Sequence, residues 1–312
     1  MAPAILAATS CSAAQAELQD SQALAVFRLT TFFKFIGCCA GLALQCVLAS
    51  SCSPLDATRD PSEGREIIQG QAFRHLVLTR NFQTASANRQ GPIFVFLEND
   101  GLPWQTPTIV SNDPTPRHPV ALALFRQTAA PAIYLGRPCH WVGTFEPPCE
   151  AYFWTDGRFH PDVLSSLLAA LRKITSTVPG SAQRLVLVGH SGGGTLATLI
   201  AHALEQPVVV VTMAAVLDHR KWTSRLAVSP LEGSLNPATE PRKSTAALTE
   251  LHVFGARDEV VKLEDAASYL ERFPAATLVL PQADHRCCWQ TWWEAEGHRL
   301  AEQLAGKLPT TK

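Results

Sequence analysis

The run Gly189-His190-Ser191-Gly192-Gly193 places glycine two residues before and two residues after a serine. Cleavage of an ester or amide needs a nucleophilic oxygen that stands clear of the surrounding chain. With glycine at those two positions, a strand can turn into a helix so sharply that the serine side chain is presented at the apex. The run therefore predicts Ser191 as a nucleophile, with Gly189, His190 and Gly193 shaping the turn.

Such a turn needs a strand directly before it and a helix directly after it. The apolar run 185–188 is typical of a buried strand, and 195–204 is expected to be the helix. Further strands are expected at 73–78, 92–97, 132–136, 208–212, 251–255 and 276–280, and further helices at 120–125 and 161–175.

This alternation of apolar strands and helices predicts an α/β fold. Each crossover must bring the chain back to the same edge of the sheet, so the sheet is expected to be mostly parallel, with helices on both faces. The segment 219–247 is irregular and rich in Pro, Arg and Ser. We expect it to form a small insertion over the sheet.

The composition excludes several classes of protein. Lys and Arg number 26 against 27 Asp and Glu, which gives a formal net charge of -1 and no overall field that would attract nucleic acid. No Cys and His cluster has the spacing of a zinc site, and no glycine pattern fits a dinucleotide site or a P-loop. We therefore expect no nucleic-acid partner, no metal and no cofactor.

From about 73 to 304 the chain resembles serine esterases of the α/β-hydrolase fold, and more narrowly uncharacterised exported bacterial members. Besides the serine turn, the motifs that carry the resemblance are Glu98-Asn99-Asp100-Gly101-Leu102-Pro103-Trp104, Gly136-Arg137-Pro138-Cys139, Trp154-Thr155-Asp156-Gly157-Arg158-Phe159 and Ser234-Leu235-Asn236-Pro237. The resemblance implies acyl transfer to water through an acyl-enzyme, without a metal. It leaves the substrate open among small-molecule and lipid-like acyl compounds.

In that fold the acid and the histidine follow the serine in chain order. Asp258 lies just beyond one predicted strand, and His285 lies in the loop beyond the next. We predict these two residues as the partners of the serine. Asp218, at the end of an earlier strand, is the alternative acid, and Asp284 is expected to be a loop-shaping or a surface carboxylate.

The resemblance also indicates where the oxyanion of the reaction would bind. Two preorganised N–H donors are needed, and the N–H of Gly192 is the first. Alignment of the loop after the strand 92–97 with the pattern of the fold makes the N–H of Asp100 the second. Asn99 stands where the fold usually has glycine, so Leu102 stays an alternative donor.

The N-terminal part of the chain has the features of an export signal. The segment 35–51 is uncharged, and Arg28 and Lys34 precede it. The run 48–52 resembles a bacterial lipobox that would attach a lipid to Cys52, although ordinary cleavage or an uncleaved signal anchor is also open. We expect a signal segment at 1–51, a linker at 52–72 and a hydrolase domain at 73–308, exported to the cell envelope or periplasm with membrane attachment through the N-terminus.

Four cysteines follow Cys52 in the chain. In an oxidising compartment Cys139 and Cys149 would close a short loop as a disulfide. The alternative is a pair of free buried thiols.

These features lead to one functional hypothesis and two alternatives. The hypothesis is a serine hydrolase that cleaves an ester-like acyl bond. The alternatives are a non-catalytic envelope binding protein on the same fold and an acyltransferase that passes the acyl group to an alcohol or peptide.

Overall fold

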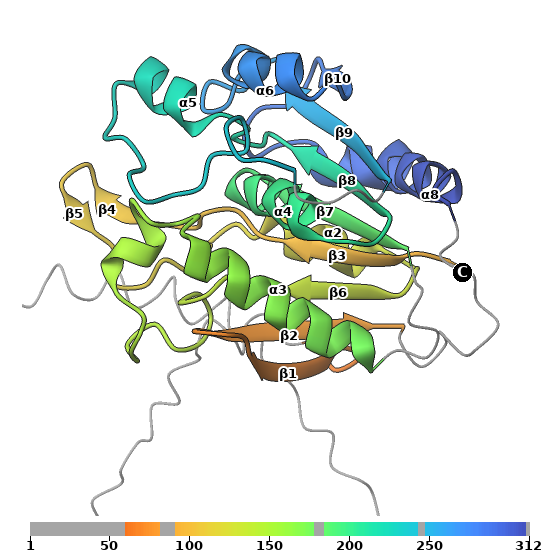
Figure 1. Ribbon diagram of the computed structural model, residues 1–312, viewed down its shortest axis with the longest axis horizontal. Coiled ribbons are helices and arrows are strands. Elements are labelled where there is room, and N and C mark those ends of the chain that lie inside the picture. Colours follow the sequence, from red (N-terminus) through yellow and green to blue (C-terminus); the bar gives the residue numbers. More distant parts are fainter. Residues whose placement is uncertain (1–59, 82–90, 178–183, 243–246, 310–312) are drawn as a thin grey trace, which may run out of the picture. The chain divides into compact units, whose positions relative to one another are not determined.

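The computed structural model describes residues 60–81, 91–177, 184–242 and 247–309 (Figure 1). The predicted signal segment, Cys52 and the part of the predicted linker before residue 60 lie outside the described residues. Within the described residues, no helix is long and apolar enough to cross a membrane.

An eight-stranded sheet forms the centre of the fold, in the order β1-β2-β6-β3-β7-β8-β9-β10. β2 pairs antiparallel with both β1 and β6, and all pairs from β6 to β10 are parallel. The mostly parallel sheet that the sequence predicts is confirmed. The strands are β1 (Gly64–Gln69), β2 (Arg74–Arg80), β3 (Ile93–Leu97), β6 (Ala132–Leu135), β7 (Leu185–His190), β8 (Val208–Met213), β9 (Leu248–Gly255) and β10 (Ala276–Leu280).

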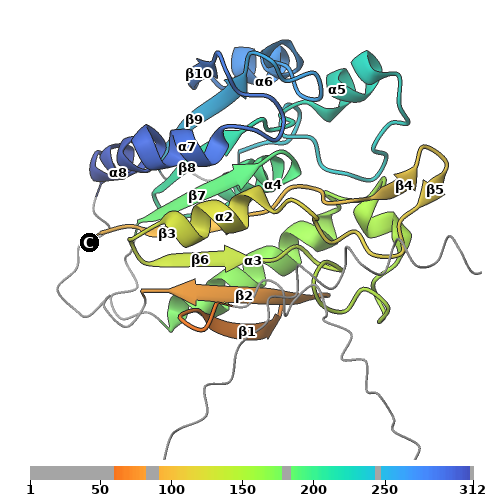
Figure 2. The same ribbon diagram turned by 180° about the vertical axis from the view of Figure 1, so that it is seen from behind.

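Helices cover both faces of this sheet, as predicted. α3 (Pro161–Ser176) and α4 (Gly192–Ala203) lie on the face seen in Figure 1, and α2 (Val120–Gln127) and α8 (His298–Gly306) lie on the face seen in Figure 2. The remaining helical segments are α5 (His219–Leu226), α6 (Ala267–Arg272), α7 (Trp289–Trp292), the 3-10 turns Ala151–Trp154 and Leu263–Ala266, and the π-helical turn Trp293–Gly297.

The alternation of side chains along β3 shows why both faces need a cover. Ile93, Val95 and Leu97 join the apolar cluster under α3 and α4. Phe94 and Phe96 point to the opposite face, where both contact the ring of Trp293. Successive residues of a strand face opposite sides, so a strand that is apolar throughout must be buried on both.

The sheet begins earlier in the chain than the sequence predicted. The segment 64–69 was expected to belong to a linker, and that prediction was wrong, because β1 pairs with β2 from Gly64 opposite Thr79 to Gln69 opposite Arg74. β1 is an edge strand with mostly exposed side chains. An edge strand needs no continuous apolar run, so the hydrophobic pattern gave no signal for it.

Several further elements were absent from the sequence prediction, including the helices α6, α7 and α8. A hairpin of β4 (Trp104–Thr106) and β5 (Ile109–Val110) follows the loop after β3. The predicted insertion at 219–247 contains the helix α5, which Asp218 caps by accepting from the backbone N–H groups of Arg220 and Lys221.

Candidate active site

Ser191 is the only residue between the end of β7 and the start of α4. Its φ of 52° and ψ of -124° lie outside the conformations that a side chain favours, and its N–H donates to the backbone oxygen of Met213 at 2.9 Å. A serine held in this conformation at a strand-to-helix junction is the local geometry that the glycine spacing predicted.

The glycines of the turn allow close backbone contacts. A Cβ on Gly189 would lie 2.3 Å from the backbone oxygen of Gly193, and a Cβ on Gly193 would lie 2.1 Å from the backbone oxygen of Leu97. No side chain fits at either position. The start of α4 therefore packs directly on the end of β3, which brings the loop after β3 next to the serine.

His285 and Asp258 approach Ser191 from the loops after β10 and β9. The hydroxyl of Ser191 donates to Nε2 of His285 at 3.1 Å, and Nδ1 of His285 donates to Oδ2 of Asp258 at 2.9 Å. Parallel strands present their carboxyl ends at one edge of a sheet, so three residues that are distant in sequence meet there. In this arrangement the imidazole can accept the serine proton while the carboxylate fixes its tautomer.

The carboxylate of Asp258 is itself held in place. Its Oδ1 accepts from the N–H groups of Val260 at 2.8 Å and Val261 at 2.9 Å, and the residue is 2% exposed. The side chain thus presents Oδ2 to His285 in a fixed orientation.

Asp218, the alternative acid, has other partners. Its Oδ1 accepts from the cap N–H groups of α5 and from Nδ2 of Asn236 at 2.9 Å, and its Oδ2 accepts from the hydroxyl of Ser268. These bonds join the start of α5 to Asn236 and to α6, and none of them involves His285.

The loop that carries His285 is stabilised on both sides of the histidine. Oδ1 of Asp284 accepts from the N–H groups of Arg286 and Cys287, each at 2.7 Å, which is the loop-shaping role expected for Asp284. Cys287 is joined by a disulfide to Cys288, which has a φ of 82°. Sequence reasoning missed this bond between neighbouring residues.

His190 connects the serine turn to the same loop. Its Nε2 donates to the backbone oxygen of His285 at 2.9 Å, and Nε1 of Trp289 donates to the same oxygen at 3.2 Å. Burial lowers the pKa of His190 to about 3, so its ring is neutral at physiological pH. The ring acts here as a hydrogen-bond donor that positions its neighbour.

The loop after β3 leaves one N–H group free beside the serine. The N–H groups of Asn99, Gly101 and Leu102 donate to Glu98 Oε1, Asn99 Oδ1 and Pro114 O at 3.0, 2.8 and 2.9 Å. Leu102, the alternative donor, is therefore already bonded. The N–H groups of Asp100 and Gly192 each have no acceptor among the described residues.

Two arginines that the sequence analysis left without a role meet the side chain of Asp100. Nη1 of Arg137 donates to Oδ1 at 2.7 Å, and Nη1 of Arg158 donates to Oδ2 at 2.8 Å. A Cβ on Gly192 would lie 1.8 Å from Oδ1 of Asp100 and 2.9 Å from Nη1 of Arg137. The ion pair thus lies against the residue that follows Ser191.

A disulfide joins Cys139 to Cys149 within the loop that follows Arg137, with the two Cα atoms 5.5 Å apart. This is the pairing that the sequence analysis weighed against two free thiols. The disulfide closes this loop two residues after Arg137, one of the two arginines bonded to Asp100.

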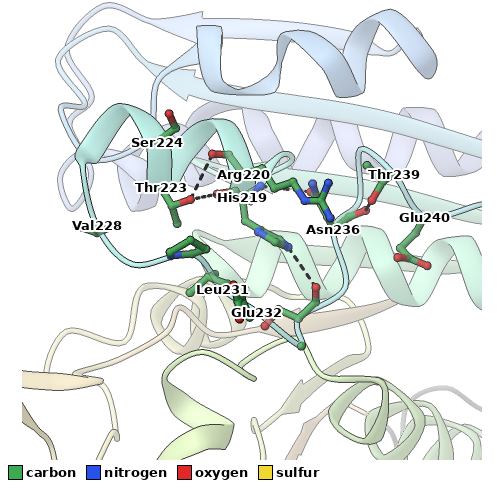
Figure 3. Close-up of a pocket in the computed structure, with 13 residues that line it drawn as sticks. His219, Arg220, Thr223, Ser224, Val228, Leu231, Glu232, Asn236, Thr239 and Glu240 are labelled. Atoms are coloured by element: carbon green, nitrogen blue, oxygen red, sulfur yellow. Dashed lines mark hydrogen bonds between the residues drawn. The ribbon is translucent and has the colours of Figure 1, made fainter.

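A cavity of about 690 Å³ lies between α5 and the segment 228–240 (Figure 3). Most of its side chains are polar, among them His219, Arg220, Glu232 and Glu240. Neither Ser191 nor His285 lines this cavity. In the part of the chain that the structure describes, no group of three or more His, Cys, Asp or Glu residues could hold a metal ion.

No protein-family model and no curated protein matches this sequence. Solved structures do match it. One is a protein of unknown function from Agrobacterium tumefaciens, a candidate α/β hydrolase, which is 17% identical and matches over 80% of this chain and 100% of its own at a TM-score of 0.52. An esterase from Pyrococcus furiosus is 14% identical over 79% of this chain and 92% of its own, with a TM-score of 0.52.

A puromycin-hydrolysing peptidase from Mycobacterium tuberculosis is also similar, with 13% identity, a TM-score of 0.51 and coverage of 79% of this chain and 40% of its own. Together with the sheet order and the two helical layers, these matches establish that the chain has the α/β-hydrolase fold. Likeness at this identity concerns the fold alone, so the activity has to be argued from the site.

Proposed function

We propose that this protein is a serine hydrolase that cleaves an ester-like acyl bond through an acyl-enzyme. The observation that carries the proposal is the hydrogen-bonded series from Ser191 through His285 to Asp258. Its members lie at the carboxyl edge of a sheet whose fold is shared with an esterase and a peptidase.

In the proposed reaction His285 removes the proton of the Ser191 hydroxyl through Nε2 as the serine oxygen attacks the acyl carbon. The carboxylate of Asp258 accepts from Nδ1 and stabilises the imidazolium that forms. The imidazolium then gives its proton to the leaving group, and an acyl-serine ester is left. A water molecule, deprotonated by His285, attacks this ester and releases the acid.

The N–H groups of Gly192 and Asp100 are proposed to bind the oxyanion of both tetrahedral intermediates. Their lack of an acceptor supports this role, since an oxyanion site has to be preorganised and empty before the reaction. Each such donor is commonly responsible for about 10²–10³-fold in kcat.

The direct test is labelling by a fluorophosphonate, which forms a covalent bond with an activated serine. Wild-type protein should be labelled and should hydrolyse p-nitrophenyl esters, and Ser191→Ala should do neither. Ser234→Ala is a matched control, since the hydroxyl of Ser234 bonds to the backbone oxygen of Asp156 and the N–H of Phe159 rather than to a histidine side chain.

The outcomes separate the three hypotheses. Folded wild-type protein that takes no label and turns over no ester would be a binding protein, and the proposal would be wrong. A protein that is labelled but releases an acylated alcohol or peptide in preference to the free acid would be an acyltransferase.

Export to the cell envelope, with lipid attachment at Cys52, is part of the proposal. The disulfides at 139–149 and 287–288 support it, since such bonds persist in oxidising compartments. The mass of the mature protein tests it: we expect a chain that begins at Cys52 and carries lipid. A chain recovered from the cytoplasm with residues 1–51 intact would contradict export.

A further inference from the structure

The Arg137–Asp100–Arg158 cluster beside Ser191 carries an excess of positive charge. Arg137 is 2% and Arg158 is 7% exposed, so both guanidiniums are largely removed from water. Two of them face the single carboxylate of Asp100. One positive charge of the cluster is therefore not balanced by Asp100. A buried, unbalanced charge costs free energy, and an anion that neutralised it there would be bound strongly.

Apart from Asp100, no neighbouring titratable side chain among the described residues forms a hydrogen bond with either guanidinium, and Glu98 acts on Arg137 only through its partial charge at a distance. The oxygens of Glu98 accept backbone N–H groups rather than guanidinium groups, and burial raises the pKa of this carboxyl to about 7. His140 is neutral, because burial lowers its pKa to about 4. Asp258 is bonded to His285 and to two backbone N–H groups.

The two arginines differ in which of their guanidinium nitrogens lack a hydrogen-bond partner and are open to a ligand. Arg137 uses Nη1 for Asp100 and Nη2 for the backbone oxygen of Arg158, and its unpartnered Nε is fully enclosed. Arg158 uses Nε for the backbone oxygen of Thr155 and Nη1 for Asp100. Its Nη2 has no partner among the described residues and is not one of the enclosed atoms.

We propose that Arg158 recognises a carboxylate group on the substrate through Nη2, so that the enzyme prefers acyl substrates with a negative charge near the scissile bond. This inference rests on the proposed serine hydrolase function. A carboxylate fits better than a phosphate dianion, since the excess of the cluster is one charge. Arg158 would then be a specificity-determining residue. It is held in place by the side-chain carboxylate of Asp100, the residue whose backbone N–H is proposed to bind the oxyanion.

The test compares pairs of esters that differ in one charge. For the acyl side, mono-p-nitrophenyl adipate is compared with the ester in which the free carboxylate is replaced by a primary amide. For the leaving group, meta-carboxyphenyl hexanoate is compared with meta-carbamoylphenyl hexanoate. The ratio of kcat/KM within each pair is independent of the fraction of active protein.

We expect a ratio of about tenfold or more in favour of the charged ester in at least one pair, which is the usual effect of a hydrogen bond to a charged group. Arg158→Gln should bring that ratio close to one, mainly through KM, and Arg158→Lys should retain part of it. Arg242→Gln is the matched control, because Arg242 pairs with Glu250 and should leave the ratio unchanged.

Each outcome decides something. Wild-type ratios of one or less in both pairs would overturn the inference without any variant, and so would a preference that Arg158→Gln leaves intact. If Arg158→Gln does not fold, the lysine variant and the wild-type ratios still decide. Protein that takes no fluorophosphonate label and hydrolyses none of the four esters would instead contradict the proposed function itself.

Discussion

His190 donates a hydrogen bond to the backbone oxygen of His285 at 2.9 Å, so a residue of the serine turn holds the loop that brings the histidine to the serine. Replacing it by leucine removes the donor and keeps the bulk. We expect His190→Leu to lower kcat by about 10–100-fold with little change in KM, since small misplacements of a reacting group are costly.

Steady-state kinetics with a p-nitrophenyl ester measure this effect. His190→Gln keeps an N–H donor and should recover part of kcat. If both variants retain wild-type kcat, the bond to His285 has no part in positioning it.

Replacing Asp258 and replacing Asp218 should have different effects on kcat and on stability. Asp258→Asn should lower kcat on the order of 10⁴-fold, because the amide cannot hold His285 in the tautomer that accepts the serine proton. Asp218→Asn should leave kcat within a few-fold of wild type and lower the free energy of unfolding by about 1 kcal/mol, through a weaker cap on α5. Kinetics and urea denaturation of both variants check the pair, and the opposite ranking of kcat would make Asp218 the acid.

The buried carboxyl of Glu98 should make the free energy of unfolding depend on pH. Burial raises the pKa of its carboxyl from 4.5 to about 7 in the folded protein, although three backbone N–H groups oppose the shift. Between those two pH values the folded chain binds more protons than the unfolded chain, so this group makes the free energy of unfolding fall as the pH rises from about 5 to 7. Above pH 7 its effect levels off.

The size of the Glu98 effect is on the order of 3 kcal/mol, since one pKa unit corresponds to about 1.4 kcal/mol. Glu98→Gln cannot titrate, so its stability should lack this fall. Urea denaturation of both proteins at several pH values gives the difference in their free energies of unfolding. The contributions of the buried histidines are common to both proteins and cancel in this difference. Parallel curves for the two proteins would show that Glu98 does not titrate in this range.

The disulfide between Cys139 and Cys149 should contribute about 2–3 kcal/mol to stability, as expected for a bond that closes a short loop. The double variant Cys139→Ser/Cys149→Ser should unfold at a lower temperature than wild type. Cys287→Ser/Cys288→Ser is the matched control, since a bond between neighbours closes almost no chain and should change the unfolding temperature much less. Equal losses in the two variants would mean that loop closure is not the cause.

The sequence was sufficient for those parts of the fold that rest on local patterns. The apolar runs of β7 and β8 must be buried whatever surrounds them, and the glycines around Ser191 are needed by the backbone of the turn itself. Both features are properties of short segments, so they could be predicted without knowing what packs against them.

The partners of Asp100 could not be predicted in that way. Arg137 follows β6 and Arg158 precedes α3, and nothing in either segment indicates that both guanidiniums meet one carboxylate. The choice between Asp258 and Asp218 was similar, since both follow strands and only their tertiary contacts differ. Contacts between loops depend on how the strands are arranged in the assembled sheet. Short sequence patterns carry no information on that arrangement.

The place of β1 in the sheet has a practical consequence for anyone who shortens this protein. A chain cut at residue 73, where the apolar pattern begins, would lose the strand that covers one side of β2 along its length. The backbone N–H and C=O groups of β2 would then be open to pairing with another molecule, which is a common route to aggregation. An expression boundary at or before residue 60 keeps that edge covered.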